Sequence, residues 1–403
     1  MPTIFGLADV DADAYRWRWT GASAALFAAM GVIALLVARA PDAFSYPQFF
    51  AEDVAVFWTG WRTLGLESFW QPYAGYLHLA PRSIAALVWP LPYQSHPFGF
   101  LVFATLGYAW TAATIATTRV HWGLGLAYAF GIMLVPQDGE IWASAVNLQW
   151  VMACALPLIA STAAPLKRTA RINQLAFLSL AGLSGPFSTF AIPLWVARGV
   201  WSVRDRSVHG KAVAAIGLTA GLIQLVFMST TTLASSLEGT RPAGMGLALF
   251  ERWGLDYLDV AGIWIGSTLF AFLIGSPIIR DGRWQRLAFL VLALIILSTV
   301  FAKFYHQPEV VTSRLVGWRY FYVPIVMLLW TALSLVWTAR PIPILVGSVA
   351  SVFIISSAMQ NFERDRRQTY SDWQEKTPLI GKAAVEIKYP PGWSLHIEPD
   401  QSR

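Results

Sequence analysis

This chain contains few charged residues. Only 13% of its 403 residues are Asp, Glu, Lys or Arg, whereas soluble domains carry about 25%. Hydrophobic residues make up 56% of the chain, and the mean hydropathy is +0.51. This composition excludes an ordinary soluble globular protein and indicates a protein that lies largely within a membrane.

Cysteine is almost absent as well. The single Cys154 lies in an apolar run, which excludes an internal disulfide and any zinc or iron–sulfur site built on cysteines. The chain also has no P-loop, no dinucleotide fingerprint and no convincing Ser-His-Asp arrangement, so nucleotide-dependent chemistry in the cytoplasm has no support. The net charge of +6 fits arginine-rich inner loops better than nucleic-acid binding, because no basic module interleaved with aromatic residues is present.

Long apolar runs are present instead. Uncharged runs cover 22–38, 97–118, 122–137, 141–166, 172–197, 212–237, 260–279, 287–302, 320–339 and 341–362, and a shorter one covers 83–95. Most come near the roughly 20 residues that cross a hydrocarbon core as a helix. Backbone groups in lipid must be satisfied within the segment, so helices are expected. We predict an all-α polytopic membrane protein with about 10–11 transmembrane or re-entrant helices.

Two parts of unequal size are expected. Residues 1–362 form a multi-helix transmembrane domain, in which the first outer loop, 39–82, contains amphipathic helices. Residues 363–403 form a small extracytoplasmic tail. Within the tail, "VEIKYPPGWSLHIEP" predicts two short strands around a Pro-Pro-Gly turn.

The topology has two solutions. Basic clusters occur at "KRTAR" (167–171), "RDRSVHGK" (204–211), "RDGRWQR" (280–286) and Arg340. If all eleven segments cross the membrane, "KRTAR" falls on the outer face, against the positive-inside rule. In the second solution the run 83–95 is re-entrant, and the run 172–197 is a hairpin that bends at "GLSGP". Both solutions place four segments on the outer face: 39–82, 238–259, 303–319 and the tail.

The first outer loop contains two adjacent acids, Glu52 and Asp53, in otherwise aromatic and apolar sequence. Adjacent residues of a helix point about 100° apart, so at most one acid would face a given cavity squarely. A carboxylate held along the membrane surface is partly desolvated, which makes it a better base. The alternative is a solvated loop carboxylate with no role.

Downstream of the acids, the element "PYAGYLHLAPR" supplies Tyr73, Tyr76, His78 and Arg82. An N-terminal helix, a long first outer loop with an early acidic pair, and this aromatic-Pro-basic element together resemble the GT-C superfamily of membrane glycosyltransferases. The resemblance implies a polyprenyl-phosphate-linked sugar donor and many helices. It implies that Asp53, or Glu52, is the general base that deprotonates an acceptor hydroxyl for inverting transfer.

Substrate contacts follow from the same resemblance. Aromatic loop side chains would stack on sugar faces, and the residues expected to bind substrate are Tyr73, His78, Arg82 and Trp58. The "WWDYG"-like string of oligosaccharyltransferases and the "HPP" element of protein mannosyltransferases are absent from this chain. The subfamily therefore stays open.

A lipid-phosphate donor needs cations where its phosphate leaves. The segment 302–324 offers Lys303, His306, Arg314 and Arg319 near the outer membrane surface. Arginine suits bidentate phosphate contact, and Arg314 ranks first because Glu309 is the only acid near it in sequence. The alternative for Lys303 and Arg319 is snorkelling at a helix end.

A second polar segment ranks lower. "PQDGEIWASAVNLQW" (136–150) contains Asp138, Glu140, Asn147 and Gln149 at a helix boundary. In the second topology it faces outward, where it could bind acceptor hydroxyls or a metal. In the first it is a cytoplasmic turn.

The resemblance thus implies an inverting glycosyltransferase that moves a sugar from a polyprenyl-phosphate donor to a glycan, lipid or protein acceptor. It would work on the periplasmic face of a bacterial inner membrane, among membrane lipids and without nucleic acid. No cofactor is required, although a divalent cation is compatible. The alternatives are a transporter or lipid-linked-sugar flippase, and an O-antigen polymerase or ligase. A transporter would have ionisable residues within its spans, whereas here they gather at one face.

Overall fold

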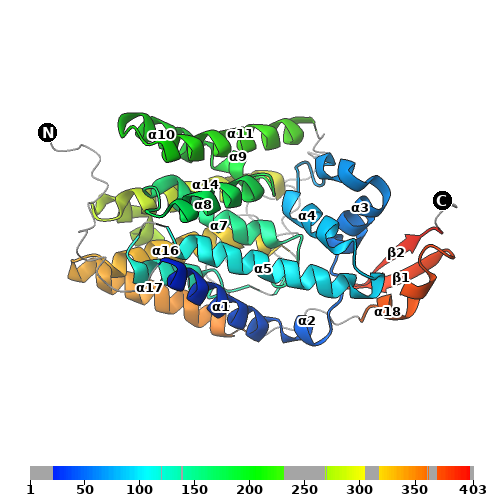
Figure 1. Ribbon diagram of the computed structural model, residues 1–403. Helices are drawn as coiled ribbons and strands as arrows, with labels where there is room; N and C mark the ends of the chain where they lie inside the picture. Colours follow the sequence, from blue (N-terminus) through cyan, green and yellow to red (C-terminus); the bar gives the residue numbers. More distant parts are fainter. Residues whose placement is uncertain are drawn as a thin grey trace.

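The computed structural model describes residues 21–118, 120–137, 139–230, 268, 270–304, 317–360, 362 and 370–399. The chain forms an elongated bundle of helices whose axes run roughly along the long dimension of the molecule (Figure 1). In the described part, six helical segments are long and apolar enough to cross a membrane: Gly21–Arg39, Tyr93–Ala116, Val208–Thr230, Arg283–Phe304, Arg319–Val336 and Pro341–Gln360. The prediction of a helical, multi-pass membrane protein is confirmed.

These segments correspond to α1 (Gly21–Arg39), η4 (Tyr93–Ser95) with α5 (His96–Ala116), α11 (Val208–Thr230), α14 (Arg283–Phe304), α16 (Arg319–Val336) and α17 (Pro341–Gln360). Shorter helices lie among them: α6 (Trp122–Gly131), α7 (Leu148–Ser161), α8 (Arg168–Gly182), α9 (Phe187–Phe190), α10 (Ile192–Arg204) and η5 (Ser276–Ile278). Buried apolar side chains from most of these helices form one continuous core.

The run 83–95 does not cross the bundle. It holds most of α4 (Leu79–Val88), which has 10 residues and is therefore about 15 Å long, and then η4 leads into α5. The run 172–197 bends as the second topology requires, since α8 ends at Gly182 and α10 begins at Ile192.

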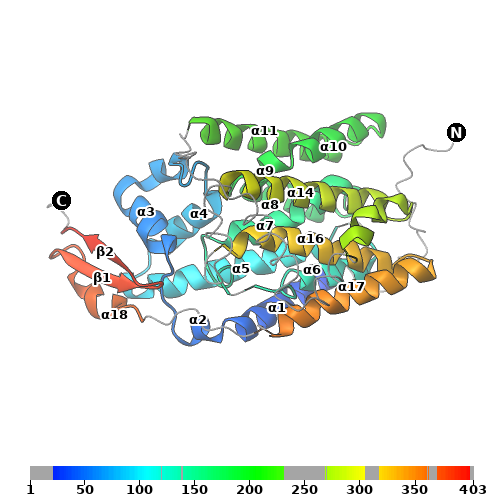
Figure 2. The same cartoon turned by 180° about the vertical axis from the view of Figure 1, so that it is seen from behind.

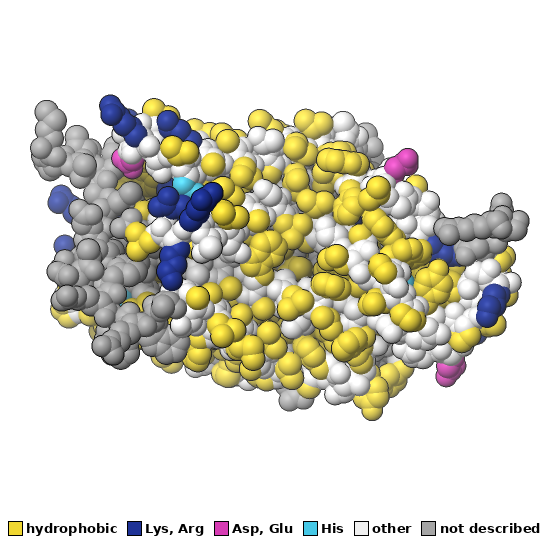
Figure 3. Space-filling view, in the orientation of Figure 1, with side chains coloured by type: hydrophobic (Ala, Val, Ile, Leu, Met, Phe, Trp, Pro, Cys, Tyr) yellow, Lys and Arg dark blue, Asp and Glu magenta, His cyan; other side chains and the backbone are white. Residues whose placement is uncertain are grey.

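The basic clusters meet at one end of the bundle, which we call the basic end. His209 of α11 hydrogen-bonds Gln174 of α8 at 2.8 Å, and the rings of Trp201 and Trp284 pack edge to face at 5.2 Å. These contacts bring "KRTAR" to the same end as the two later clusters. In Figure 3, Lys and Arg side chains accordingly gather toward that end of the visible face.

Two apolar runs are shorter as helices than their hydropathy predicts. The runs 122–137 and 141–166 were expected to be continuous segments, but residues 132–137 and 139–147 form no helix. Hydropathy reports compatibility with an apolar environment, and this segment is buried inside the protein instead of facing lipid. Irregular backbone is tolerated at such depth only where protein groups satisfy it.

Side chains from other helices satisfy that backbone. Arg39, fully buried at the end of α1, donates to the carbonyls of Met133 at 2.7 Å and Val135 at 3.3 Å. The hydroxyl of Tyr322 in α16 donates to the carbonyl of Ile132 at 2.8 Å. The buried Arg39 therefore satisfies several backbone carbonyls where the helix is interrupted.

Residues 39–82, predicted as the first outer loop and still called by that name below, fold as short helices at the opposite end, which we call the site end. Its elements are α2 (Pro41–Ser45), the π-helix η2 (Asp53–Trp58), α3 (Thr59–Leu64) and η3 (Gly65–Trp70), followed by α4. Figure 2 shows them beside the tail. Residues 238–259 and most of the segment 303–319 lie outside the described residues.

The tail forms α18 (Trp373–Lys376), η6 (Thr377–Leu379) and an antiparallel hairpin of β1 (Val385–Tyr389) and β2 (Trp393–Ile397). The two strands expected around the Pro-Pro-Gly turn are confirmed. Trp373 anchors the tail, because its ring packs on Phe49 at 4.7 Å and on Trp58 at 5.2 Å, both in the first outer loop.

Candidate active site

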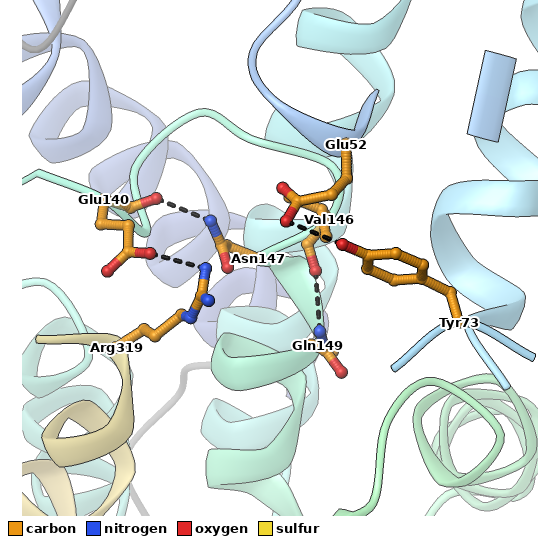
Figure 4. Close-up of polar contacts among 7 residues, drawn as sticks. All are labelled: Glu52, Tyr73, Glu140, Val146, Asn147, Gln149 and Arg319. Carbon is orange, nitrogen blue, oxygen red and sulfur yellow. Dashed lines mark hydrogen bonds and ion pairs between the residues drawn. The ribbon is translucent and has the colours of Figure 1, made fainter. Parts of the chain in front are cut away.

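A polar cluster lies at the site end, where three parts of the chain converge. Glu52 comes from the first outer loop, Glu140 and Asn147 from the irregular segment before α7, and Arg319 from the first turn of α16. Figure 4 shows these side chains, with Tyr73 and Gln149, around the start of α7. We call this set the polar cluster.

Asp53 is turned into the protein. It is 4% exposed, and its carboxylate accepts the backbone N–H of Val146 at 2.8 Å and that of Ala145 at 3.3 Å. A carboxylate held by two amide donors is a strong structural contact. Asp53 therefore fastens the first outer loop to the irregular segment.

Glu52 points in a different direction, as expected for adjacent residues. The hydroxyl of Tyr73 donates to Glu52 Oε1 at 3.2 Å (Figure 4). Burial, followed by the nearby Glu52 carboxylate, raises the pKa of Tyr73 to about 12. The phenol thus stays protonated at neutral pH and remains a donor to the carboxylate.

A tight turn presents Tyr73 to Glu52. Tyr73 and Tyr76 exchange backbone hydrogen bonds at 3.0 and 3.2 Å, and the two residues between them, Ala74 and Gly75, have φ of 52° and 91°. Two successive positive φ values are typical of a two-residue type I′ turn, for which glycine at the second position is well suited. The string "YAGY" therefore encodes this turn locally.

The residue after the turn is clamped onto the bundle. Leu77 N donates to Gln224 Oε1 at 2.8 Å, and Gln224 Nε2 donates back to Leu77 O at 3.1 Å. Gly185, in the bend after α8, also donates to Leu77 O at 2.9 Å. A buried glutamine in α11 thus satisfies both polar groups of one residue and fixes where the tyrosine turn sits.

Arg319 and Glu140 form an ion pair at 2.6 Å, with side chains 27% and 12% exposed. Asn147 Nδ2 donates to the backbone carbonyl of Glu140 at 2.8 Å, which holds the acid in place. The positive charge of Arg319 also acts on Tyr73, where it opposes the rise in pKa. The guanidinium therefore lies close enough to influence the Glu52 side of the cluster.

Backbone strain concentrates in the same segments. Among the described non-glycine residues, positive φ occurs at Ala51 (46°), Ala74 (52°), Ala143 (56°) and Arg206 (53°). The three alanines directly precede Glu52, follow Tyr73, or lie in the irregular segment. Such conformations cost about 1–3 kcal/mol each and gather at functional sites, so their distribution supports the choice of this cluster.

Three residues expected to bind substrate are buried and hydrogen-bonded to other parts of the protein. Trp58 is 1% exposed and donates to His96 Nδ1 at 2.7 Å, so its ring has no face open to a sugar. Buried His78 hydrogen-bonds the Tyr73 carbonyl at 3.2 Å, and Arg82 donates to Gln71 O at 2.7 Å. In this structure these side chains hold the loop in shape.

The four expected phosphate ligands are only partly described. Arg319 belongs to the cluster. Lys303 is exposed near the end of α14, 5.3 Å from the ring of Phe304, which packs on Tyr320 at 4.8 Å. Arg314 and His306 lie outside the described residues, as does Asp138. Within the described part, no group of three or more His, Cys, Asp or Glu side chains could hold a metal ion.

One residue whose pKa is affected by Glu52 was not predicted from the sequence. Tyr389, at the end of β1, is buried, and burial followed by the Glu52 carboxylate raises its pKa to about 12. The pattern of β1 identifies Tyr389 as inward-facing. No local signal, however, indicates that it packs near a residue of the first outer loop.

The chain matches no known family model and no curated protein sequence.

Proposed function

We propose that this protein is a membrane glycosyltransferase of the inverting, polyprenyl-phosphate-sugar-dependent type, with Glu52 as the general base. Glu52 would take the proton from an acceptor hydroxyl while that oxygen attacks the anomeric carbon of the donor. The bond from the anomeric carbon to the phosphate oxygen breaks, and the lipid phosphate leaves with the electron pair. A single displacement of this kind inverts the anomeric configuration.

The observation that supports this proposal best is that the two adjacent acids have different surroundings. Asp53 is occupied by two backbone amides, whereas Glu52 is partly exposed and accepts a hydrogen bond from Tyr73. The proposal therefore assigns the base to Glu52 and a structural role to Asp53. Positioned general bases contribute about 10²–10⁴-fold to rate.

Arg319 would receive the departing phosphate. Its guanidinium is already anchored by Glu140, so its remaining N–H groups are held in a fixed orientation near the base. Pre-oriented donors of this kind stabilise developing negative charge without reorganising during the reaction. Lys303, Arg314 and His306 remain proposed contributors from the same part of the sequence.

The proposal places the cluster on the extracytoplasmic face of the membrane. Lys and Arg concentrate at the opposite end of the bundle, and basic loops are retained on the cytoplasmic side. An enzyme on the outer face has no access to cytoplasmic sugar nucleotides, which is the reason for proposing a lipid-linked donor. The acceptor would be a glycan, lipid or protein of the cell envelope.

A flippase for lipid-linked sugars is the second candidate, and one feature favours it. The interruption between α6 and α7 puts irregular backbone inside the bundle. Discontinuous helices of this kind build the substrate sites of many transporters. Here, however, Arg39 and Tyr322 satisfy part of that backbone, so the interruption also has a purely structural explanation.

Glycosyl transfer and flipping can be separated in proteoliposomes. Full-length protein is supplied with a panel of polyprenyl-phosphate sugars and hydroxyl acceptors, and product formation and lipid translocation are both measured. We expect inverted product from wild type and a loss of about 10²–10⁴-fold in Glu52→Gln. Translocation without product would replace this proposal with the flippase.

A further inference from the structure

The C-terminal hairpin contacts the residue directly before Glu52. The N–H of Ala51 donates to the carbonyl of Pro390, in the turn between β1 and β2, at 2.8 Å. Ala51 is buried and has a φ of 46°. An alanine in the left-handed region is disfavoured by its Cβ, so something outside the loop must hold it there.

The tail that carries this hairpin contacts both the first outer loop and η4. Trp373 Nε1 donates to the carbonyl of Tyr93 at 2.9 Å, and the N–H of Ser371 donates to Gln48 Oε1 at 2.8 Å. At the far edge, Arg62 donates to the carbonyl of Glu398 at 3.0 Å. The hydrogen bond to Ala51 is therefore one of several contacts that would be lost together.

We infer that the C-terminal hairpin is a positioning element of the active site. By holding Ala51 in its left-handed conformation, it aims the carboxylate of Glu52 at Tyr73 and the polar cluster. Tyr389 lies in the same hairpin, and the Glu52 carboxylate contributes, after burial, to the raised pKa of its phenol. The inference rests on the proposed function only for its prediction about transfer rate.

The contact has a clear conformational consequence. Rotation of Ala51 to an ordinary φ would redirect the chain immediately before Glu52 and break the geometry that lets Tyr73 donate at 3.2 Å. Glycine has no Cβ and adopts positive φ without this cost. If the hairpin acts by holding Ala51, then glycine at this position should make the site less dependent on the hairpin.

The test uses full-length protein and a variant that loosens the hairpin, Trp373→Ala. The left-handed conformation of an L-residue is disfavoured by a factor of about 5–30, so we expect transfer to fall by a factor of that order. Ala51→Gly, added to Trp373→Ala, should recover most of the loss. Leu379→Ala, an exposed position in the same tail, is the matched control and should change nothing.

A second background separates positioning from folding. In Glu52→Gln, Trp373→Ala should cost no further activity, because there is no base left to aim. A multiplicative further loss would overturn the inference, since it would mean that the hairpin only stabilises the fold. If Trp373→Ala does not fold, the milder Gln48→Ala replaces it in the same series.

Hydrogen exchange gives a readout that does not depend on the reaction. Overlapping peptides that isolate the Ala51 amide should show at least about tenfold faster exchange in Trp373→Ala than in wild type, because that amide loses its acceptor. Faster exchange in the hairpin with an unchanged Ala51 amide would overturn the inference. Absence of transfer in wild type would count against the proposed function alone, since exchange still decides whether the hairpin holds Ala51.

Discussion

Asp53, Glu140 and Arg319 at the site end are paired and largely turned inward, whereas most charged side chains at the basic end are exposed. Asp53 is held by two amides and Glu140 by Arg319. The exposed cations at the other end are Lys167, Arg168, Arg171, Arg204, Arg206, Lys211, Arg280, Arg283 and Arg340. Burying a charge is costly unless it is paired and hydrogen-bonded, so the pairing of these three side chains supports placing the proposed chemistry at the site end.

The buried arginines show that burial alone is a weak guide. Arg286, near the basic end, is fully buried, yet it donates to the carbonyl of Ile279 at 2.6 Å and serves as a cap. Arg39 does the same for the irregular segment. What distinguishes the polar cluster is the combination of paired acids, tyrosine hydroxyls and left-handed alanines in three separate segments.

The largest effects should come from the adjacent acids, and they should differ in kind. Glu52→Gln should reduce the rate of transfer by about 10²–10⁴-fold while leaving the melting temperature close to that of wild type. Asp53→Asn should lower the free energy of unfolding by about 1.5–3 kcal/mol, because its hydrogen bonds to the amides lose the charged acceptor. Transfer assays and thermal unfolding in detergent measure the two effects.

Glu67→Gln is the matched control for this pair, since Glu67 is an exposed acid of the same loop. It should change neither activity nor stability. A stable but inactive Asp53→Asn, together with an active Glu52→Gln, would reverse the assignment of base and structural acid.

The sequence identified the acidic pair but could not choose between its members. The choice depends on the amides of Ala145 and Val146, which lie 92 and 93 residues away in the chain. Local conformation, by contrast, was predicted from the sequence at "GLSGP", as a bend, and at "YPPGW", as a hairpin. Their mutual arrangement depends on long-range hydrogen bonds that no local pattern records.

The interruption of 132–147 and the role of Ala51 were hidden for the same reason. An apolar run predicts a continuous membrane span whether lipid or protein surrounds it. The hydrogen bonds from Arg39 and Tyr322 to its carbonyls show that this run is irregular and enclosed by protein. Alanine has no sequence tendency toward positive φ, so nothing local marks Ala51 as strained. The sequence therefore allowed residues of the polar cluster to be named as candidates, but it did not predict how they are arranged or which contacts they make.

The next effect concerns the ion pair that supports the proposed phosphate site. Arg319→Ala should reduce transfer by about 10²-fold, and Arg319→Lys should recover part of it, because lysine keeps the charge without the planar fork. Glu140→Gln alone should cost less than tenfold. Adding Glu140→Gln to Arg319→Ala should cost nothing more, since the acid acts through the arginine.

This cycle is read from kcat and KM for the donor. An equal loss in both single variants that multiplies in the double variant would contradict a shared role. In that case Glu140 would act on the substrate by itself.

A smaller effect should appear in the pH dependence of stability. Burial lowers the pKa of His78 to about 3, while an unfolded histidine titrates near 6.5. Between these values the unfolded chain binds a proton that the folded chain does not, so stability is complete above about pH 6.5 and falls as the pH is lowered. The contribution of one such group has a slope of at most about 1.4 kcal/mol per pH unit.

The measurement compares melting temperatures of wild type and His78→Gln from pH 7 to pH 4.5. Carboxylates titrate in both proteins, so the informative quantity is the difference between the two curves. Wild type should lose stability more steeply. Parallel curves would indicate that the ring is accessible to protons, and the comparison between a buried site end and an exposed basic end would weaken.

The smallest effect on activity should come from the basic end, where labelling can nevertheless show which face each end occupies. Cys154 is fully buried, so a cysteine introduced at an exposed position can be labelled selectively. Ser394→Cys in the hairpin and Arg206→Cys at the basic end should both keep transfer within about twofold, because surface changes rarely exceed ±0.5 kcal/mol. A membrane-impermeant maleimide added to intact cells should label Ser394→Cys and leave Arg206→Cys unlabelled until the membrane is opened. The reverse pattern would put the polar cluster on the cytoplasmic side, where the case for a lipid-linked donor no longer holds.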